Sequence, residues 1–432
     1  MKAAIVGAGI GGLVAAYDLA RDGAEVTILE AADYVGGLAS GFKDPRWEWT
    51  VEHFYHHWFA SDKHMLGLIE ELGWSDKVLF TRPLTAVYFD ESFYPLDSAM
   101  AVLRFRGLPF IDRIRLGTGI AYLRFVARWE SLEKYTAHEW LQRWVGERAY
   151  RILWEPLLVG KFGKYYKEVN MAWFWARVKA RTPRLGTYTG GFQAFMDAFA
   201  DRLREMGVDI RLRTPVERVE PSPTGGLIVH TKEETLKVDC CLVTTSPAQL
   251  AKIAPDLPDD YLEQLLGLKS MGAVVMILAL KHRLSEAGIY WHNMSKEAGF
   301  PFLSLVEHTN FLSPEFFGGE HIVYVGDYLD VDHEYFQLTK EQLLERFLPS
   351  LARMNPDFSA DWIRETWIFR SRYAQPVPPL NHSAAIPDIQ TPLPGLWFAS
   401  MSQVYPWDRG TNFAVEIARR AVQGMISEYE SR

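Results

Sequence analysis

The most polar-aromatic stretch of the chain is TVEHFYHHWF, residues 50–59. It contains His53, Tyr55, His56 and His57. Imidazoles titrate near neutral pH, so these side chains could donate hydrogen bonds or take up protons beside a bound molecule. A cluster of ordinary structural histidines, some of them exposed, would give the same pattern. The sequence leaves both roles open and makes His53, Tyr55 and His56 candidate catalytic residues.

Two arginines in WIFRSRYAQPVPPL, residues 367–380, could bind a negative charge. Arg370 and Arg372 are two positions apart, and side chains at this spacing in a strand lie on one face. Guanidinium groups placed in this way suit a phosphate or a carboxylate of a substrate. A solvated strand edge is the alternative. Arg372 joins the candidate catalytic residues, and both arginines are candidates for the charged end of a substrate.

The start of the chain, MKAAIVGAGIGGLVAAYDLARDGAEVTILE, predicts a strand, a turn, a helix and a second strand. Gly7 and Gly9 allow a sharp turn that comes close to a pyrophosphate, and Gly12 allows the helix to pack tightly on the sheet. The N-terminus of the helix favours the phosphate charge. Glu30 follows the second strand, where an acid can bind a pair of ribose hydroxyls. Together these elements predict a dinucleotide-binding unit.

The same apolar start could imitate an export signal or a membrane anchor. Gly7, Gly9, Gly11 and Gly12, however, would weaken an inserted helix. Asp18, Arg21 and Asp22 also interrupt the run before the roughly 20 apolar residues that a membrane span needs. We therefore expect neither a signal nor an anchor here.

Composition narrows the class of protein. The chain has 432 residues, of which 48% are hydrophobic and 23% charged, as in globular proteins of two or three domains. A net charge of −8 gives no electrostatic argument for a nucleic-acid partner. The only cysteines, Cys240 and Cys241, are adjacent, so we expect no long-range disulfide, no cysteine-based metal site and a cytoplasmic location. Aromatic residues at 14% fit a large pocket, a membrane-touching face or extra core.

The predicted elements group into two discontinuous domains. Residues 1–75, 185–254 and 391–432 carry the strands and helices of an α/β unit, including GGFQAFMDAFADRLREMGVDIRL and GLWFAS. Residues 76–184, which look helical, and 255–390, which begin with the strand GAVVMILALK, form a second domain inserted into the first. A ligand would bind in the cleft between the two domains.

The segment RFRGLPFIDRIRLGTGIAYLRFVARW, residues 104–129, interleaves six arginines with apolar residues. It could lie on an anionic membrane as an amphipathic surface. A helix pair with a solvated basic side is the alternative, and the sequence favours it.

Beyond the glycine-rich start and Glu30, the double glycine of GGLAS, residues 36–40, resembles the FAD-binding start of the flavin amine oxidase superfamily. That group includes protoporphyrinogen oxidases and phytoene desaturases and, more distantly, UDP-galactopyranose mutases. The segments GGFQAFMDAFADRL and GLWFASMSQVYPWDRGTNFAVEIARRA are similar to its middle and closing FAD segments. The resemblance implies an α/β fold, with a Rossmann-like FAD-binding domain of the GR2 type and a discontinuous α+β substrate domain.

The resemblance also implies how FAD is held. Thr411 or Asn412 could cap the last helix and direct its amides at the flavin. No cysteine lies near this segment, so we expect non-covalent FAD. The implied FAD-binding residues are Gly7, Ala8, Gly9, Ile10, Gly11, Gly12, Glu30, Ala31, Gly36, Gly37, Leu38, Ala39, Val216, Thr244, Gly410, Thr411, Asn412 and Phe413.

The chain departs from the family in its substrate domain. Flavin amine oxidases typically carry a lysine in the long strand that corresponds to GAVVMILAL, where this chain has Val275 and Met276. This departure argues against amine oxidation. The usual Gly-Asp after the closing strand is also replaced, by Ala399 and Ser400.

The resemblance predicts an FAD-dependent oxidoreductase of oxidase, dehydrogenase or desaturase type that acts on a bulky, partly apolar substrate bound between two domains. Two alternatives stay open. One is a redox-neutral flavoenzyme on a nucleotide sugar or lipid-linked sugar, and the other is a lipid-binding escort protein like the GDP-dissociation inhibitors. Expected partners are a small-molecule or lipid-like substrate and, at the periphery, a membrane. The sequence leaves the substrate, the electron acceptor and the oligomeric state undetermined.

Overall fold

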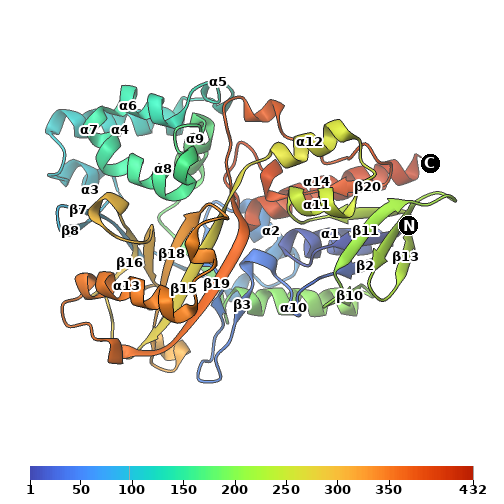
Figure 1. The fold of residues 1–432 in the computed structure, drawn as a ribbon, viewed down its shortest axis with the longest axis horizontal. Helices are drawn as coiled ribbons and strands as arrows, with labels where there is room; N and C mark the ends of the chain where they lie inside the picture. The colour runs from blue at the N-terminus through green and yellow to red at the C-terminus, as the bar shows by residue number, and fades with distance from the viewer. Residues whose placement is uncertain (97, 432) are drawn as a thin grey trace.

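The computed structural model describes residues 1–96 and 98–431. Two lobes lie side by side along the long axis, and both ends of the chain lie at the same end of the molecule (Figure 1). We call the lobe with the chain ends the first lobe and the other the second lobe. The boundaries of the two predicted domains stay a prediction.

A five-stranded parallel sheet forms the centre of the first lobe. Its strands, in spatial order, are β10 (Asp209–Arg211), β2 (Glu25–Leu29), β1 (Lys2–Val6), β14 (Cys240–Val243) and β20 (Leu396–Phe398). In β1, Ala3 and Ile5 join one hydrophobic core, while Ala4 and Val6 join another on the opposite face. Such burial on both faces is typical of parallel sheets and explains why these strands read as short apolar runs.

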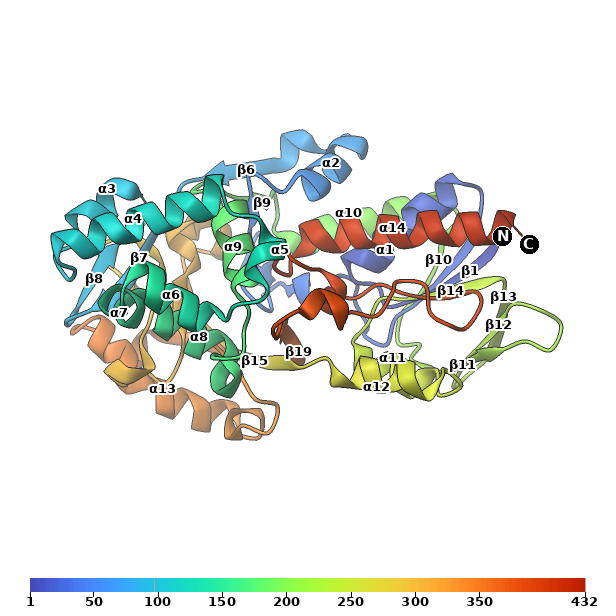
Figure 2. The same cartoon turned by 90° about the horizontal axis from the view of Figure 1, so that it is seen from above.

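Different layers cover the two faces of this sheet (Figures 1 and 2). One face carries the helices α1 (Ile10–Arg21), α10 (Phe192–Glu205) and α14 (Thr411–Glu430). The other carries α11 (Pro247–Ile253), α12 (Asp259–Gly267) and the three-stranded sheet β11 (Val216–Pro221), β12 (Leu227–Thr231) and β13 (Thr235–Val238). The short helix α2 (Lys63–Glu71) packs on α14. The helices and strands predicted for this lobe are therefore present.

A seven-stranded sheet forms the second lobe. Its strands, in order, are β19 (Ile363–Pro376), β15 (Ser270–Leu280), β18 (His321–Leu329), β17 (Ser304–Glu307), β16 (Ile289–Asn293), β7 (Leu84–Phe89) and β8 (Ser92–Pro95). Neighbouring strands are antiparallel except for β16 and β7. Helix α13 (Lys340–Met354) covers one face, and an aromatic core that includes Trp47 and Trp49 covers the other.

Seven helices complete the second lobe. They are α3 (Ala99–Arg104), α4 (Phe110–Phe125), α5 (Trp129–Leu132), α6 (Ala137–Val145), α7 (Glu147–Ala149), α8 (Glu155–Phe162) and α9 (Met171–Ala180). The helical character predicted for residues 76–184 is wrong before residue 96, because β6 (Val78–Thr81), β7 and β8 occupy that part. Aromatic and β-branched residues favour strands there, and Asp90 and Glu91 form the turn between β7 and β8 with positive φ angles of 49° and 57°.

Three short elements bring the histidine-rich stretch to the boundary between the lobes. These are the hairpin β3 (Gly41–Phe42) and β4 (Val51–Glu52), and the strand β5 (Trp58–Phe59), which pairs with β9 (Leu185–Tyr188). Within the described residues, no helix is both long enough and apolar enough to cross a bilayer.

Candidate active site

Two glycine turns meet at the carboxyl end of the parallel sheet. Gly7 has a φ of +105° and donates its amide to the carbonyl of Leu29 at 2.9 Å. Gly36 donates its amide to the carbonyl of Ala8 at 2.8 Å. A Cβ atom on Gly37 would lie only 3.2 Å from the Cα of Gly9. The turns are thus in direct backbone contact, which residues with side chains would not allow.

Glu30 ties the first turn to the end of β2. Its carboxylate accepts the amide of Ala8 at 2.7 Å and the amide of Ala32 at 2.8 Å. Each oxygen keeps lone pairs for further donors, such as the hydroxyl pair of a ribose. The neighbouring Ala31 is exposed.

Two helices begin at the same place, beside these turns. Gly9 and Gly410 precede α1 and α14, and neither helix start receives a hydrogen bond from a capping side chain. A Cβ on Gly11 would lie 3.7 Å from the carbonyl oxygen of Ala414, so the two starts are neighbours (Figure 2). Unpaired amides and two helix dipoles together favour negative charge at this point.

The predicted capping role of Thr411 and Asn412 is wrong. Thr411 accepts a hydrogen bond from the indole of Trp58 at 3.1 Å. Asn412 accepts the amides of His64 at 2.8 Å and Met65 at 3.1 Å, so it caps the start of α2 instead. Both side chains are engaged by neighbouring elements because α2 and β5 pack against this end of α14. The first amides of α14 therefore stay available to a ligand.

Threonines after β14 complete the first turn. Thr244 donates its hydroxyl to the carbonyls of Val6 and Gly7, at 3.0 and 3.2 Å. The hydroxyl of Thr245 is buried and has no hydrogen-bond partner among the described residues, although its methyl group lies beside Gly7. Buried hydroxyls are normally hydrogen-bonded, so a polar atom of a bound ligand would supply the partner that the hydroxyl of Thr245 lacks here.

The remaining predicted FAD residues lie around the same point. Val216 begins β11, and Thr214 just before it donates its amide to the carbonyl of Glu30 at 2.7 Å. Leu38 and Ala39 belong to the turn that follows Gly36. Phe413 stacks on Trp407, with ring centroids 5.3 Å apart. The glycine cradle, the acid at the end of β2 and the uncapped helix starts fit a dinucleotide such as FAD.

His53 lies in an aromatic box next to the second glycine turn. Its ring is buried between Phe42 and Phe369, and its Nδ1 is 3.0 Å from the hydroxyl of Ser40. Ser40 donates its own proton to the carbonyl of Gly37 at 2.6 Å. The hydroxyl oxygen must therefore accept from Nδ1–H, which leaves Nε2 as the acceptor nitrogen.

The expectation that these histidines titrate near neutral pH is wrong. Burial lowers the pKa of His53 and of His56 to about 4, and that of His57 to about 3. The Nδ1 of His56 lies 2.5 Å from the carbonyl of Phe54, so it carries the proton and Nε2 is again the acceptor. These histidines are neutral hydrogen-bonding groups at physiological pH.

Tyr55 packs beside the histidines. Its hydroxyl lies 3.1 Å from that of Ser304, and its ring meets Trp291 edge-on at 4.8 Å between centroids. Burial raises its pKa well above the usual range. Tyr55 therefore stays neutral, with an apolar ring and a hydroxyl that can form hydrogen bonds.

The prediction that Arg370 and Arg372 share a substrate-facing side is wrong for Arg370. Its guanidinium donates to the carbonyls of Tyr335, at 3.0 Å, and Leu338, beside α13. The neighbouring Phe369 instead points to the opposite face, toward His53. Arg372 is exposed, in a stretch where the ladder between β15 and β19 changes register and strict alternation fails.

Sequence reasoning missed a group of cations between the lobes. Lys161 of α8 and Arg177 of α9 are each only 8% exposed, although they are charged. Arg409, just before α14, donates to the side-chain oxygen of Gln375 at 3.1 Å, and Lys161 donates to the same oxygen at 3.2 Å. The sequence did contain a signal for these buried cations. Lys161 and Arg177 lie in the apolar segments EPLLVGKF and MAWFWARVKA, where charged side chains are unusual.

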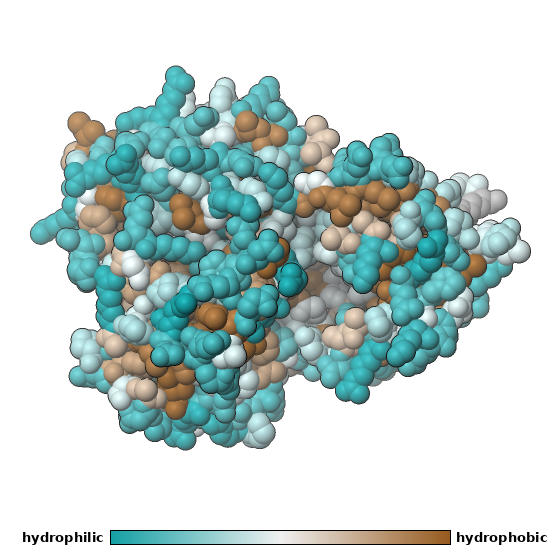
Figure 3. Space-filling model, in the orientation of Figure 1, coloured by the Kyte–Doolittle hydropathy of each residue, from teal (hydrophilic) through white to brown (hydrophobic). Residues whose placement is uncertain are grey.

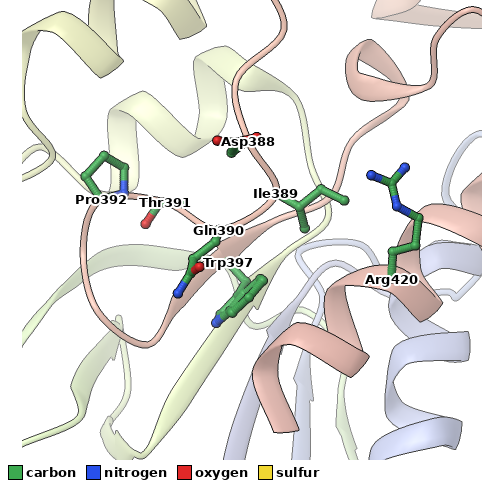
Figure 4. A pocket seen from close by; sticks show the side chains of 7 residues that line it. All are labelled: Asp388, Ile389, Gln390, Thr391, Pro392, Trp397 and Arg420. Atoms are coloured by element: carbon green, nitrogen blue, oxygen red, sulfur yellow. The ribbon is translucent and has the colours of Figure 1, made fainter. Parts of the chain in front are cut away.

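The hydropathy surface shows a hollow between the lobes (Figure 3). A different hollow of about 480 Å³ lies in the first lobe, between residues 388–392, Trp397 and Arg420 (Figure 4). None of the residues predicted for the site lines it. Among the described residues, no cluster of three or more histidine, cysteine or acidic side chains could hold a metal ion.

Known proteins share this architecture. A 15-cis-phytoene desaturase of Synechococcus elongatus is 30% identical over 158 residues, which are 33% of this chain and 33% of that enzyme. The chain thus aligns with only a third of that relative. A protein of Exiguobacterium sp. 255-15, provisionally assigned as a protoporphyrinogen oxidase, has a TM-score of 0.79 at 17% identity and covers 99% of both chains. Reduced UDP-galactopyranose mutase has a TM-score of 0.77 at 14% identity, covering 99% of this chain and 95% of the other.

The family model described as flavin-containing amine oxidoreductase matches residues 10–426. This match agrees with the glycine cradle, Glu30 and the uncapped helix starts. The chain belongs to the flavin-containing amine oxidoreductase family.

Proposed function

We propose that the chain oxidises a bulky, partly apolar substrate held between the two lobes, and that simple amines are not its substrates. Bound FAD supplies the two-electron acceptor for such a reaction. The observation that carries the proposal is the apolar character of the surroundings of Tyr55. A Cβ on Gly326 would touch both Tyr55 and Val275 at 3.1 Å, so an apolar side chain of β15 faces Tyr55.

The chain's own groups support binding and proton handling. Tyr55, Trp291 and Phe59 offer aromatic walls that exclude water from an apolar substrate. We assign to the Nε2 atom of His53, or of His56, the role of accepting a hydrogen bond or proton as the substrate is oxidised. A neutral imidazole with a low pKa suits a hydrogen-bond acceptor better than a strong base.

Anaerobic flavin reduction tests this proposal. Benzylamine and spermine should leave the flavin of the purified protein oxidised, whereas apolar substrates should bleach it. Rapid bleaching by either amine would contradict the proposal. With a working substrate, His53→Gln should lower kcat more than it changes KM, because the group acts mainly in the transition state. His230→Gln, on β12 and bonded to Glu220, is the matched control and should change neither constant.

A redox-neutral reaction on a nucleotide sugar or lipid-linked sugar is the second candidate. The buried cations Lys161 and Arg177 and the half-buried Arg409 favour it, because such substrates carry phosphate groups. Product analysis separates the two. Net oxidation consumes an acceptor in proportion to product, and a redox-neutral reaction converts substrate with no net consumption.

We also propose that helix α4 binds the surface of an anionic membrane. Its outward face is apolar, with Phe110 65%, Ile111 76% and Phe125 76% exposed. Ile114, Tyr122 and Val126, at 45%, 43% and 68%, extend this face. Exposed apolar side chains on one face of a helix are costly in water and typical of interaction surfaces.

Charge complementarity favours a membrane as the partner. Arg113 and Arg124 lie on one side of the apolar face and Arg115 on the other, at the helical spacing. When the apolar face of such a helix enters the membrane, the arginines beside it can contact acidic lipid headgroups. This helix lies at the outer edge of the second lobe, on the side away from the chain ends (Figure 2).

Vesicle sedimentation tests the membrane proposal. The protein should bind vesicles of phosphatidylcholine with phosphatidylglycerol more tightly than vesicles of phosphatidylcholine alone. The double variant Ile111→Ser with Phe125→Ser should weaken binding by about tenfold or more, because two exposed apolar side chains that would enter the bilayer are lost. Leu266→Ser with Leu380→Ser, at positions 63% and 43% exposed elsewhere, is the control. Equal binding by all three proteins, or none by the wild type, would contradict the proposal.

A further inference from the structure

Four cationic side chains from three segments face one another between the lobes. We call Lys161, Arg177, Arg181 and Arg409 the cationic cluster. Arg409 lies over the ring of Tyr328, with its guanidinium carbon 5.1 Å from the ring centroid, and the ammonium of Lys161 lies 4.5 Å from the same centroid. Arg181 lies 5.6 Å from the ring centroid of Phe59, on the side of the histidine stretch. The cluster thus has aromatic walls.

Negative charge within the protein does not balance the cluster. Asp408 pairs with Arg177 at 3.2 Å and also accepts the indole of Trp173 at 3.1 Å. Lys161 and Arg409 instead share one neutral oxygen, that of Gln375. Among the described residues, Asp408 is the only carboxylate paired with a member of the cluster. Lys161 is thus held out of water without a counter-charge, which is costly, so a bound anion would stabilise it.

The electrostatics of the cluster agree with this imbalance. Burial, followed by the charges of Arg177 and Arg409, lowers the pKa of Lys161 well below its usual range. Burial would raise the pKa of Asp408, but Lys161, Arg177 and Arg409 outweigh it and hold that pKa well below its usual range.

The cluster is open to a ligand on one side. Arg181 is exposed and Arg409 half-buried, although protein surrounds both closely. Arg409 immediately precedes Gly410 and the uncapped start of α14. Its charge and that of Arg181 also contribute, after burial, to the low pKa values of His56 and His57. The cluster therefore borders the histidine stretch and the predicted flavin position.

We propose that the cationic cluster binds the diphosphate group of a diphosphate ester and so places its substrate between the lobes. This inference rests on the proposed function, since it names the class of substrate for the same site. A carboxylate would neutralise only one of the uncompensated cations, whereas a diphosphate carries two or three negative charges. Arginine forks and a lysine point charge are the groups that bind phosphate oxygens in proteins.

Titration of the FAD-loaded protein with inorganic pyrophosphate tests the inference. Perturbation of flavin absorbance and calorimetry report binding. Arg181→Gln and Lys161→Gln should each weaken pyrophosphate binding by about tenfold or more, because each removes a charged hydrogen bond. Arg184→Gln, an exposed neighbour that lies over Phe80, is the matched control and should bind as the wild type does. Arg181→Lys keeps the charge and should restore part of the affinity.

Two further probes distinguish sources of the diphosphate. Tighter binding of geranyl diphosphate than of pyrophosphate would indicate a lipid ester, and tighter binding of uridine diphosphate a nucleoside ester. Absence of pyrophosphate binding by a wild-type protein that carries FAD would overturn this inference alone. A wild-type protein without FAD would overturn the proposed function as well. Unchanged pyrophosphate affinity in Arg181→Gln and Lys161→Gln, together with a lowered flavin potential, would also overturn the inference, because the cations would then serve the flavin.

Discussion

Glu30 links the sequence motif to the geometry of the first turn. Its two hydrogen bonds, to the amides of Ala8 and Ala32, hold the turn against the end of β2. Its remaining lone pairs point to a second role, in binding the ribose hydroxyls of the cofactor. Stability and cofactor content should therefore respond together when this carboxylate is removed.

We predict that Glu30→Ala yields a folded protein largely without FAD, because charge-assisted hydrogen bonds to ribose are each worth about 1.5–3 kcal/mol. Flavin absorbance per chain after gel filtration measures this. Glu25→Ala is the control, since Glu25 begins the strand that Glu30 follows, is exposed and pairs with Lys2. FAD content in Glu30→Ala equal to that in Glu25→Ala would contradict the assignment.

The buried histidines predict a pH dependence of stability. Burial lowers the pKa of His53 from 6.5 to about 4. Between these values the unfolded chain binds the proton and the folded chain does not, so stability is present above pH 6.5 and is lost as the pH falls toward 4. The loss from this one group amounts to about 3 kcal/mol at its folded pKa.

We therefore expect acidification from pH 7.5 to pH 4 to lower the thermal unfolding midpoint of the wild type more than that of His53→Gln. The difference between the two midpoints should shift toward the variant. Differential scanning fluorimetry across this range measures it. A gap independent of pH would show that His53 is not held neutral by burial.

At the scale of elements, helix α1 depends on one close approach. A Cβ on Gly12 would lie 2.0 Å from the carbonyl oxygen of Gly7, so a side chain there would push the helix off the first turn. A Cβ on Gly67, in the middle of α2, would meet nothing within 4 Å. Both residues are glycines inside helices, but only Gly12 is required by packing.

We predict opposite outcomes for the same substitution at these two sites. Gly12→Ala should lower both the unfolding midpoint and the FAD content, because the overlap forces the turn to move. Gly67→Ala should keep FAD and gain up to about 1 kcal/mol of stability from its helix propensity. Thermal unfolding and flavin content of both variants provide the measurement. Equal behaviour of the two variants would contradict this account of the turn.

The sequence predicts elements well where the signal is local. The first glycine turn, α1 and Glu30 lie within 24 residues of one another, and their order alone determines their arrangement. The cationic cluster depends instead on how α8, α9 and the segment before α14 pack, so no spacing in the sequence indicates it. The misplaced Arg370 has a similar cause. Arg370 pairs with Val274 in the regular part of the ladder between β15 and β19, and the packing of α13 on that face of the sheet decides that it points away from the histidines.

Side chains whose partners are distant also escaped prediction. Asn412 lies at a helix start and looks like a cap, but it serves α2, more than 340 residues earlier in the chain. The low pKa values of His53, His56 and His57 likewise come from burial by segments far away in the sequence. Residue type alone identifies the candidate residues. Their hydrogen-bond partners and protonation states depend on how the two lobes pack.

At the scale of the whole molecule, the two lobes have separate tasks that meet at their boundary. The first lobe supplies the glycine cradle, Glu30 and the uncapped helix starts. The second supplies the aromatic walls and three members of the cationic cluster, Lys161, Arg177 and Arg181. The start of α14, which directly follows Gly410, lies where the lobes meet (Figure 1). Substrate and cofactor would thus approach each other from opposite lobes.

The state of the bound flavin tests the central claim most directly. Both cysteines, Cys240 and Cys241, are buried in β14, so neither can attach the cofactor. We predict that the purified protein carries one FAD per chain and that acid precipitation releases all of the yellow colour into the supernatant. Released flavin should run as FAD, not FMN, in chromatography. A colourless protein, or colour retained in the precipitate, would contradict the account.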